Sequence, residues 1–341
     1  MSNEFAHATV QDGTTPVKRP SRWGLSNWPV GWKVLAIALV PLTLAGVLGG
    51  MRIYSGWNDA ANLQRAADRA ELVPDITQYM AALETALLVN STGADAQPAL
   101  TAYDSSRKAL AAKLADIDAV PDVSKGVTTM LDGGQQLLNA VTANAIGLRE
   151  RVIAYAPILL TAEDAINGSV RVDDEKIRAE TLGLSRAVGA RGQMMMQQLL
   201  VNRGGDVPEP ELRTSMITLA GTEPSTLFGM SQVLGVGSPD AQKLQEQLVR
   251  RMGLMSDPAS VLAGNPDLSQ SIQVTNDIAA TIIADTSGSV TSAVETQAAD
   301  RRSAAIRDTV AVAVAILVAL IVRNMGFEYR HKRDSDGWRR D

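Results

Sequence analysis

Two apolar runs without charged residues stand near the two ends of the chain. Thr309–Val322 reads TVAVAVAILVALIV. As a helix it spans about 21 Å, which is less than the roughly 30 Å hydrocarbon core of a membrane. Val34–Met51, VLAIALVPLTLAGVLGGM, is long enough to cross on its own. Together the runs predict transmembrane helices at residues 33–51 and 307–325, with most of the chain between them.

A cleaved signal peptide is the alternative interpretation of the first run. Its apolar core is longer than that of a usual signal sequence, and it follows a leader of 33 residues. Small residues at Ala45-Gly46 and Gly49-Gly50 leave a cleavage site open. We expect an uncleaved membrane anchor.

Helical periodicity repeats throughout the region between the two runs. A helix is expected to continue outward from Arg52, and Val73, Ile76, Met80, Leu83 and Leu87 then form a seam with spacings of 3, 4, 3 and 4. Apolar stripes and breaks at Pro, Gly and Asn predict further helices over residues 98–117, 127–141, 151–167, 175–203 and 241–255. One more begins after Pro208/Pro210, and the last starts near Pro266. Residues 221–240 are rich in Gly, Ser, Thr and Pro, so we expect them to be partly looped.

Strand signals are nearly absent, because no segment alternates apolar and polar residues with β-branched and aromatic enrichment. Aromatic residues make up only 4% of the chain, against 45% hydrophobic residues. The pattern therefore predicts an all-α fold. We expect a helical bundle domain at residues 52–306, built as two stacked four-helix bundles, between the two transmembrane helices. Residues 1–32 are expected to be a disordered leader and residues 326–341 a short basic tail.

The charge distribution predicts the orientation in the membrane. Residues 1–33 carry four basic and two acidic residues, and residues 323–341 carry six basic and four acidic ones, although the whole chain has a net charge of −5. The acidic excess lies between the two runs. The positive-inside rule then places both termini in the cytoplasm and residues 52–308 outside. Trp28, Trp32 and Trp57 flank the first run as an interfacial belt would. A two-pass protein of a plasma (inner) membrane fits this pattern.

The composition argues against most enzyme classes. The chain has no cysteine, and its two histidines, His7 and His331, lie in the expected cytoplasmic segments. The outer region can therefore build neither a thiolate or histidine metal site nor a Ser-His-Asp triad. No glycine-rich phosphate loop is present. We expect no catalytic residue, no metal, no cofactor and no enzymatic activity, and the acidic middle region argues against nucleic acid as a partner.

One arginine falls on an apolar seam. Arg191 lies between Val188 and Met195 on the stripe of the helix at 175–203, where a guanidinium requires a polar partner. One interpretation is an anion site within the bundle. Its candidate residues are Arg191, Arg186, Arg149 and Arg151. The alternative is an internal ion pair with an acidic residue such as Glu84 or Glu163, or a side chain that reaches solvent.

Two segments carry a family resemblance. With Tyr155-Ala-Pro-Ile-Leu-Leu160 and Ser185-Arg-Ala-Val-Gly-Ala-Arg-Gly-Gln-Met194, and with its layout over residues 30–325, the chain resembles the N-terminal part of actinobacterial sensor histidine kinase-like proteins with a nitrate- and nitrite-sensing (NIT) domain. The resemblance implies paired helical bundles in which arginines hold a small planar anion. Arg191 and Arg186 would correspond to the later arginine element. The segment aligned with the earlier element reads Leu83-Glu84-Thr85 and lacks its arginine.

These observations lead to two functional hypotheses. The first is a sensor region of a signal-transduction receptor that binds a small anion such as nitrate or nitrite and signals through the second transmembrane helix. The resemblance implies a homodimer and cytoplasmic signalling partners, and the kinase region of that family is expected to be absent from this chain. The second hypothesis is a membrane-anchored interaction or scaffold protein without a small ligand. A pocket holding Arg191 favours the receptor, and a packed interior with Arg191 paired to a carboxylate favours the scaffold.

Overall fold

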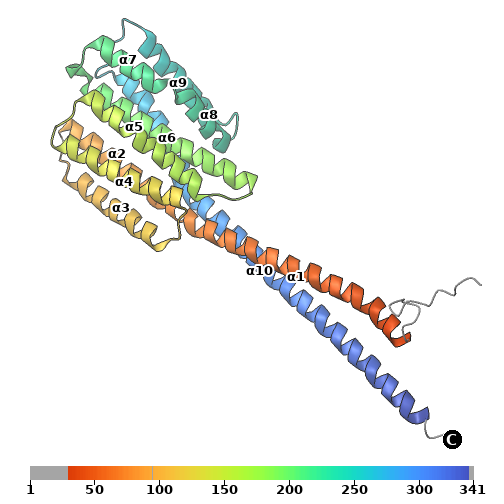
Figure 1. The fold of residues 1–341 in the computed structure, drawn as a ribbon. Helices are drawn as coiled ribbons and strands as arrows, with labels where there is room; N and C mark the ends of the chain where they lie inside the picture. The colour runs from red at the N-terminus through yellow and green to blue at the C-terminus, as the bar shows by residue number, and fades with distance from the viewer. Residues whose placement is uncertain (1–29, 94, 338–341) are drawn as a thin grey trace, which may run out of the picture. The chain divides into compact units, whose positions relative to one another are not determined.

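The computed structural model describes the backbone of residues 30–93 and 95–337, and every regular element among these residues is helical (Figure 1). This confirms the all-α prediction for the described chain. The leader expected at residues 1–32 falls almost entirely outside the described residues, as do Trp28 and the last four residues of the tail.

The helices follow one another with short connections. Their bounds are α1 Val30–Ala70, α2 Leu72–Thr92, α3 Gln97–Asp116, α4 Pro121–Thr142, α5 Leu148–Ser169, α6 Glu175–Arg203, α7 Glu209–Ala220, α8 Glu223–Leu234, α9 Pro239–Ser256 and α10 Pro266–Gly337. A short 3₁₀ turn, η2 Gly204–Asp206, follows α6. Several predicted boundaries are close to these, because proline at the first turn and glycine after the last turn mark helix ends.

The chain divides into two compact units. One comprises residues 55–307, and the other comprises residues up to Tyr54 together with those from Asp308 onward. The first unit contains the bundle and every cavity discussed below. The second contains the described parts of the two apolar runs.

The core of the bundle begins with α2. All five residues of its predicted seam, from Val73 to Leu87, are buried at 3% exposure or less. In the first part of the bundle α2 packs against α3, α4, α5 and α6. Tyr79 donates a hydrogen bond to the carbonyl of Met130 on α4, and its ring lies 5.6 Å from that of Tyr103 on α3. The 3-4 spacing therefore identified a helix that is surrounded by neighbours.

Helix α6 is shared by both parts of the bundle. It contacts α2 and α5 on one side and α7 and α8 on the other. Small residues permit this close packing, since a Cβ atom added at Gly192 would lie 2.6 Å from Leu159 of α5. Helix α5 passes through Pro157 without ending, so this proline does not mark its start.

Residues 221–240 are partly looped, as expected, but most of the segment is helical. Helix α8 occupies Glu223–Leu234 and buries Leu227 and Met230. Its composition is rich in residues with low helix propensity, but packing against α6 and α9 supplies what the propensity lacks. The connection that follows contains Gly235 and Gly237 at φ +85°, and the Ser238 hydroxyl accepts the Ala241 N–H to cap α9.

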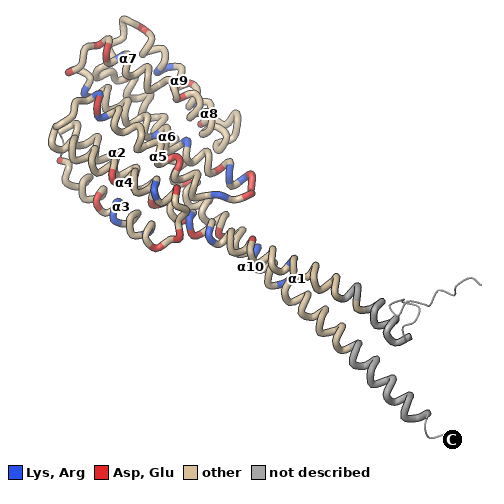
Figure 2. Tube along the Cα trace, viewed as in Figure 1, with Lys and Arg blue, Asp and Glu red and all other residues tan. Residues whose placement is uncertain are grey.

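The second unit contains one candidate membrane helix among the described residues. The apolar part of α10 is long and hydrophobic enough to cross a membrane, and its side chains are mostly exposed. Residues 309–321 of α10 include no charged residue, and Figure 2 shows a tan stretch of α10 before its grey end. Arg52 and Asp308 form an ion pair of 3.0 Å at the start of this unit. Many side chains of the first apolar run, Val34–Met51, lie outside the described residues. A membrane span at this run therefore stays a prediction.

Candidate functional site

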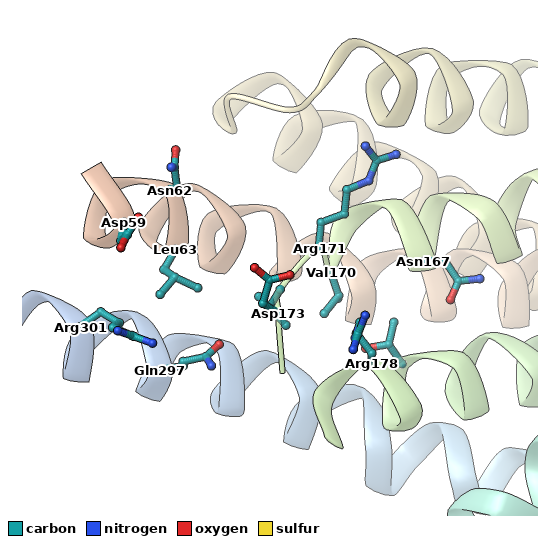
Figure 3. Close-up of a pocket in the computed structure, with 12 residues that line it drawn as sticks. Asp59, Asn62, Leu63, Asn167, Val170, Arg171, Asp173, Arg178, Gln297 and Arg301 are labelled. Carbon is teal, nitrogen blue, oxygen red and sulfur yellow. The ribbon is translucent and has the colours of Figure 1, made fainter. Parts of the chain in front are cut away.

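A cleft of ≈ 680 Å³ opens on the bundle between α1, the α5–α6 connection and α10 (Figure 3). The lining side chains are mainly polar. They comprise Asp59, Asn62 and Leu63 of α1, Asn167 of α5, Val170, Arg171, Val172 and Asp173 of the connection, Arg178 and Thr181 of α6, and Gln297 and Arg301 of α10. No residue of this cleft was a candidate in the sequence.

The α5–α6 connection shapes one wall of the cleft. Val170 and Val172 are buried at 4% and 6% exposure, whereas the residue that follows each of them, Arg171 and Asp173, is exposed. This alternation is that of an extended segment, in which successive side chains point to opposite sides. The connection is held at its end by Asp174, whose side chain accepts the Ile177 N–H at 3.0 Å and caps α6. The two valines thus anchor the segment that places Asp173 at the cleft.

Several charged side chains of the cleft form no ion pair with another described residue. No ion pair within 4.0 Å involves Arg178, Arg301, Asp59 or Asp173 among the described residues. The amide oxygen of Gln297 is buried and accepts no hydrogen bond. An unsatisfied buried acceptor is costly, so a donor that reaches this oxygen would stabilise it.

Arg191, the leading candidate from the sequence, forms a buried ion pair. Its Nε lies 2.8 Å from Oε2 of Glu84, and the Tyr155 hydroxyl donates to Oε1 of the same carboxylate at 2.9 Å. The ion-pair alternative with Glu84 is therefore confirmed. Burial raises the pKa of Glu84 to about 7, against the opposing effect of the Arg191 charge and the Tyr155 hydrogen bond.

Arg191 also lines a cavity. The structure therefore has both the pocket that favours the receptor hypothesis and the carboxylate partner that favours the scaffold hypothesis. The cavity measures ≈ 290 Å³ and is bordered by residues of α2, α6 and α10, among them Glu84, Met194 and Asn276. An anion entering it would meet the Glu84 carboxylate as well as the guanidinium. The local charge therefore does not favour an anion while Glu84 is ionised.

Arg186 has the same arrangement one turn and a half earlier on α6. Its guanidinium lies 3.1 Å from Oε2 of Glu163 on α5. Burial raises the pKa of Glu163 to about 7, and the Arg186 charge acts in the opposite direction. The second acidic residue considered for an internal ion pair thus pairs with Arg186 rather than with Arg191.

Arg149 and Arg151 lie elsewhere, at the start of α5. Arg149 forms an exposed ion pair of 3.3 Å with Glu211, and Arg151 donates to the Ser91 hydroxyl at 2.9 Å and to the Asn144 side chain at 2.9 Å. Both line a cleft around the α4–α5 connection, whereas Arg191 lines the cavity beside α10. The structure does not bring the four arginines to one cavity. Anion binding by any of them stays a prediction.

The most deeply buried charges were missed in the sequence. Arg251 of α9 and Glu223 of α8 are 0% and 1% exposed and form an ion pair of 2.6 Å. Arg251 also donates to Thr275 of α10 at 2.6 Å, and Gln197 of α6 donates to Glu223. A signal existed, because Leu244, Leu248, Arg251 and Met255 follow the 4-3-4 spacing that singled out Arg191.

Metal coordination has no candidate in the part of the chain that the structure describes. No group of three or more His, Cys, Asp or Glu side chains gathers there. The chemistry available to the cleft is therefore recognition by charge and hydrogen bonding through arginine, carboxylate and amide groups.

Comparison with known proteins gives one match. Searches among curated proteins and among solved structures found none. A protein-family profile, described as a domain of unknown function (DUF8316), matches residues 55–320, which is more than half of the chain. The match starts at the first residue of the bundle unit and continues into the apolar part of α10. The chain therefore belongs to the DUF8316 family.

Proposed function

We propose that this chain is the sensor region of a membrane-anchored receptor, in which a small ligand bound by the bundle changes the relation between α1 and α10. The observation that carries the proposal is the composition of the cleft walls. Asp59 on α1 and Arg301 on α10 line the same cavity. These two helices are also the ones whose sequences continue into the apolar runs.

A ligand in such a cleft contacts the first and last helices of the bundle simultaneously. It shifts their relation only by binding one arrangement more tightly than another. Helix α10 is unbroken from Pro266 to Gly337, so a displacement at Arg301 has no intervening loop to absorb it. Piston, rotation and scissor movements are all compatible with this layout.

The membrane topology is part of the proposal. It comprises two spans, a bundle built as two stacked four-helix bundles outside the membrane, and both termini in the cytoplasm. The candidate span in α10 and the basic residues beyond it support this topology. Reporter fusions at the two ends and cysteine accessibility within the bundle test it directly.

Nitrate and nitrite are candidate ligands only because the chain resembles NIT-domain proteins. The candidate arginines are engaged by Glu84, Glu163, Glu211 and Ser91, and this lends the anion hypothesis no support. Titration of the chain with nitrate, with Arg191→Ala as control, tests it. Binding that the substitution abolishes would establish that site.

The scaffold hypothesis has one observation in its favour. Phe228, Val236 and Val249, on α8, its following connection and α9, are 67%, 81% and 68% exposed. Exposed apolar side chains of this size occur at protein interfaces. A chain that binds no small molecule but loses a partner after Phe228→Ser would favour the scaffold over the receptor.

The experiment that tests the receptor proposal is a ligand screen on the full chain in lipid nanodiscs. A compound that raises the thermal unfolding midpoint is retested on Arg301→Gln, which removes a cationic wall of the cleft. The matched control is Arg302→Gln, the neighbouring exposed arginine that does not line the cleft. The proposal predicts loss of the shift in the first variant only. A screen of polar metabolites without a single hit contradicts it.

A further inference from the structure

We infer that the cleft between α1 and α10 binds a small zwitterion, with one carboxylate, one ammonium group and a short aliphatic body. This inference rests on the proposed function, because it names the class of ligand for the same cleft. It follows from the presence of both positive and negative side chains in the cavity lining, from an acceptor without a donor, and from the apolar side chains between them.

Charges of both signs line the cleft. Figure 3 shows the guanidinium of Arg171 directed away from Asp173 and Gln297. The Arg171 charge also acts on Arg69, whose pKa is lowered first by burial and next by Arg171. Besides Arg171, the lining contains two arginines, Arg178 and Arg301, and two carboxylates, of Asp59 and Asp173. A simple anion would meet both carboxylates, so a neutral ligand with both charges fits better than nitrate or acetate.

The positive pole of the site recognises a carboxylate. A guanidinium presents its N–H donors in a planar fork that matches two carboxylate oxygens. Arg178 at the start of α6 and Arg301 on α10 have no ion-pair partner among the described residues. Arg301 belongs to α10 and lies on the wall of the cleft opposite α1 (Figure 3).

The negative pole requires hydrogen-bond donors on the ligand. The Gln297 amide oxygen is buried without a donor, and Asp173 lies on the facing wall of the cleft (Figure 3). An ammonium group has three N–H donors and no acceptor, which suits a carboxylate together with an amide oxygen. A ligand with only a carboxylate would leave the Gln297 oxygen unsatisfied.

The apolar part of the lining limits the body of the ligand. Leu63, Val170 and Val172 contribute aliphatic surface to the cavity, and no aromatic side chain is among the lining residues. Burial of a few methylene groups there favours binding, at about 0.8 kcal/mol for each fully buried group. The volume of ≈ 680 Å³ lies within the range of small-molecule sites.

The test uses three probes that share a short carbon chain and differ only in charge. Norvaline carries both charges, pentanoate carries the carboxylate alone, and pentylamine carries the ammonium alone. Isothermal calorimetry on the full chain in nanodiscs measures each affinity. We expect norvaline to bind at least about tenfold more tightly than either partial analogue, because each analogue leaves one pole of the cleft unpaired.

Variants locate the binding on the cleft. Arg301→Gln and Asp59→Asn should each lower the affinity for norvaline by about tenfold, since each removes one charge of the site. Arg302→Gln should leave the affinity unchanged, and circular dichroism verifies that all three variants are folded. Norvaline binding that Arg301→Gln does not alter overturns the inference, because the ligand then lies elsewhere.

Two outcomes separate this inference from the receptor proposal. Pentanoate or nitrate that binds as tightly as norvaline, and loses affinity in Arg301→Gln, overturns the zwitterion class but retains the cleft as a sensor site. Absence of binding by norvaline at millimolar concentration overturns the zwitterion class as well. The broader screen of polar metabolites then decides the receptor proposal independently.

Discussion

Arginine–glutamate pairs connect the helices of the bundle at three places, and the glutamate is buried in each. Arg191 pairs with Glu84, Arg186 with Glu163, and Arg251 with Glu223. The apolar spacing of the sequence identified Arg191 as a residue that needs a partner, and it named Glu84 and Glu163 as candidates. It could not assign the partners, because these depend on which helices become neighbours in the fold.

Loss of one member of the Arg251–Glu223 pair should destabilise the bundle strongly. Arg251→Met leaves the Glu223 carboxylate buried without its cation, and the expected loss is about 3–5 kcal/mol in the free energy of unfolding. Arg250→Met is the matched control. Arg250 is exposed beside Asp267, so its loss should cost less than about 1 kcal/mol. Denaturant unfolding measures both, and equal effects would contradict the role assigned to the buried pair.

The two paired glutamates predict a pH dependence of stability. The pKa of Glu84 is raised to about 7 from its ordinary value of 4.5, so the folded chain binds a proton at this site that the unfolded chain has released. The contribution of Glu84 to stability is therefore fully present below about pH 4.5, and it declines as the pH rises toward 7. Glu163 acts in the same direction.

Glu84→Gln should remove this part of the pH dependence. The variant carries no titrating proton at position 84, so its unfolding free energy should fall less than that of the wild type between about pH 4.5 and 7. Denaturant titrations at several pH values compare the two slopes. Identical slopes would mean that Glu84 is ionised throughout this range in the folded chain.

At the scale of helices, prolines at helix starts predicted the observed boundaries better than helix propensity did. Pro98 and Pro266 predicted the starts of α3 and α10 to within a residue or so, whereas α4 begins at Pro121, six residues before the expected stripe. Helix α8 was missed because its glycines, serines and threonines resemble a loop when they are considered without neighbours. Its stability depends on the contacts of Leu227 and Met230, which are properties of the packed bundle.

Helix α6 should not tolerate a methyl group at Gly192, where it packs closely on α5. Alanine at Gly192 would place Cβ 2.6 Å from Leu159 and 3.1 Å from the Tyr155 oxygen. Gly192→Ala should therefore lower stability by about 1–3 kcal/mol, although alanine favours helix. Gly288→Ala on α10 is the control, because nothing lies within 4 Å of its added Cβ. It should stabilise by up to about 1 kcal/mol, and a gain at both positions would contradict the close packing of α6.

For the whole molecule, the sequence predicted the class of fold and the limits of the bundle, but not the site. The predicted domain at residues 52–306 lies close to the compact unit at 55–307. The cleft was missed because its residues come from three segments that are distant in sequence and follow no common period. Val170 and Val172 carried a weak signal, since they alternate with Arg171 and Asp173 in a short non-helical connection.

The packing of α1 on α10 within the bundle predicts a disulfide. A Cβ atom at Gly56 would lie 3.8 Å from that of Ala305, which matches the mean separation in natural disulfides. The chain has no cysteine of its own, so Gly56→Cys combined with Ala305→Cys forms the only pair available. Oxidation should link the two helices quantitatively, as seen by altered gel mobility. Failure to link would show that these helices are not adjacent at this level.

The central claim is that a ligand in the cleft changes the relation between α1 and α10. Spin labels at exposed positions of the two helices, through Asn58→Cys and Ala299→Cys, report their separation in the full chain in nanodiscs. We expect saturating norvaline to shift the distribution of distances, and Arg301→Gln to abolish the shift. A distribution that stays the same while calorimetry shows the compound bound would contradict the receptor account.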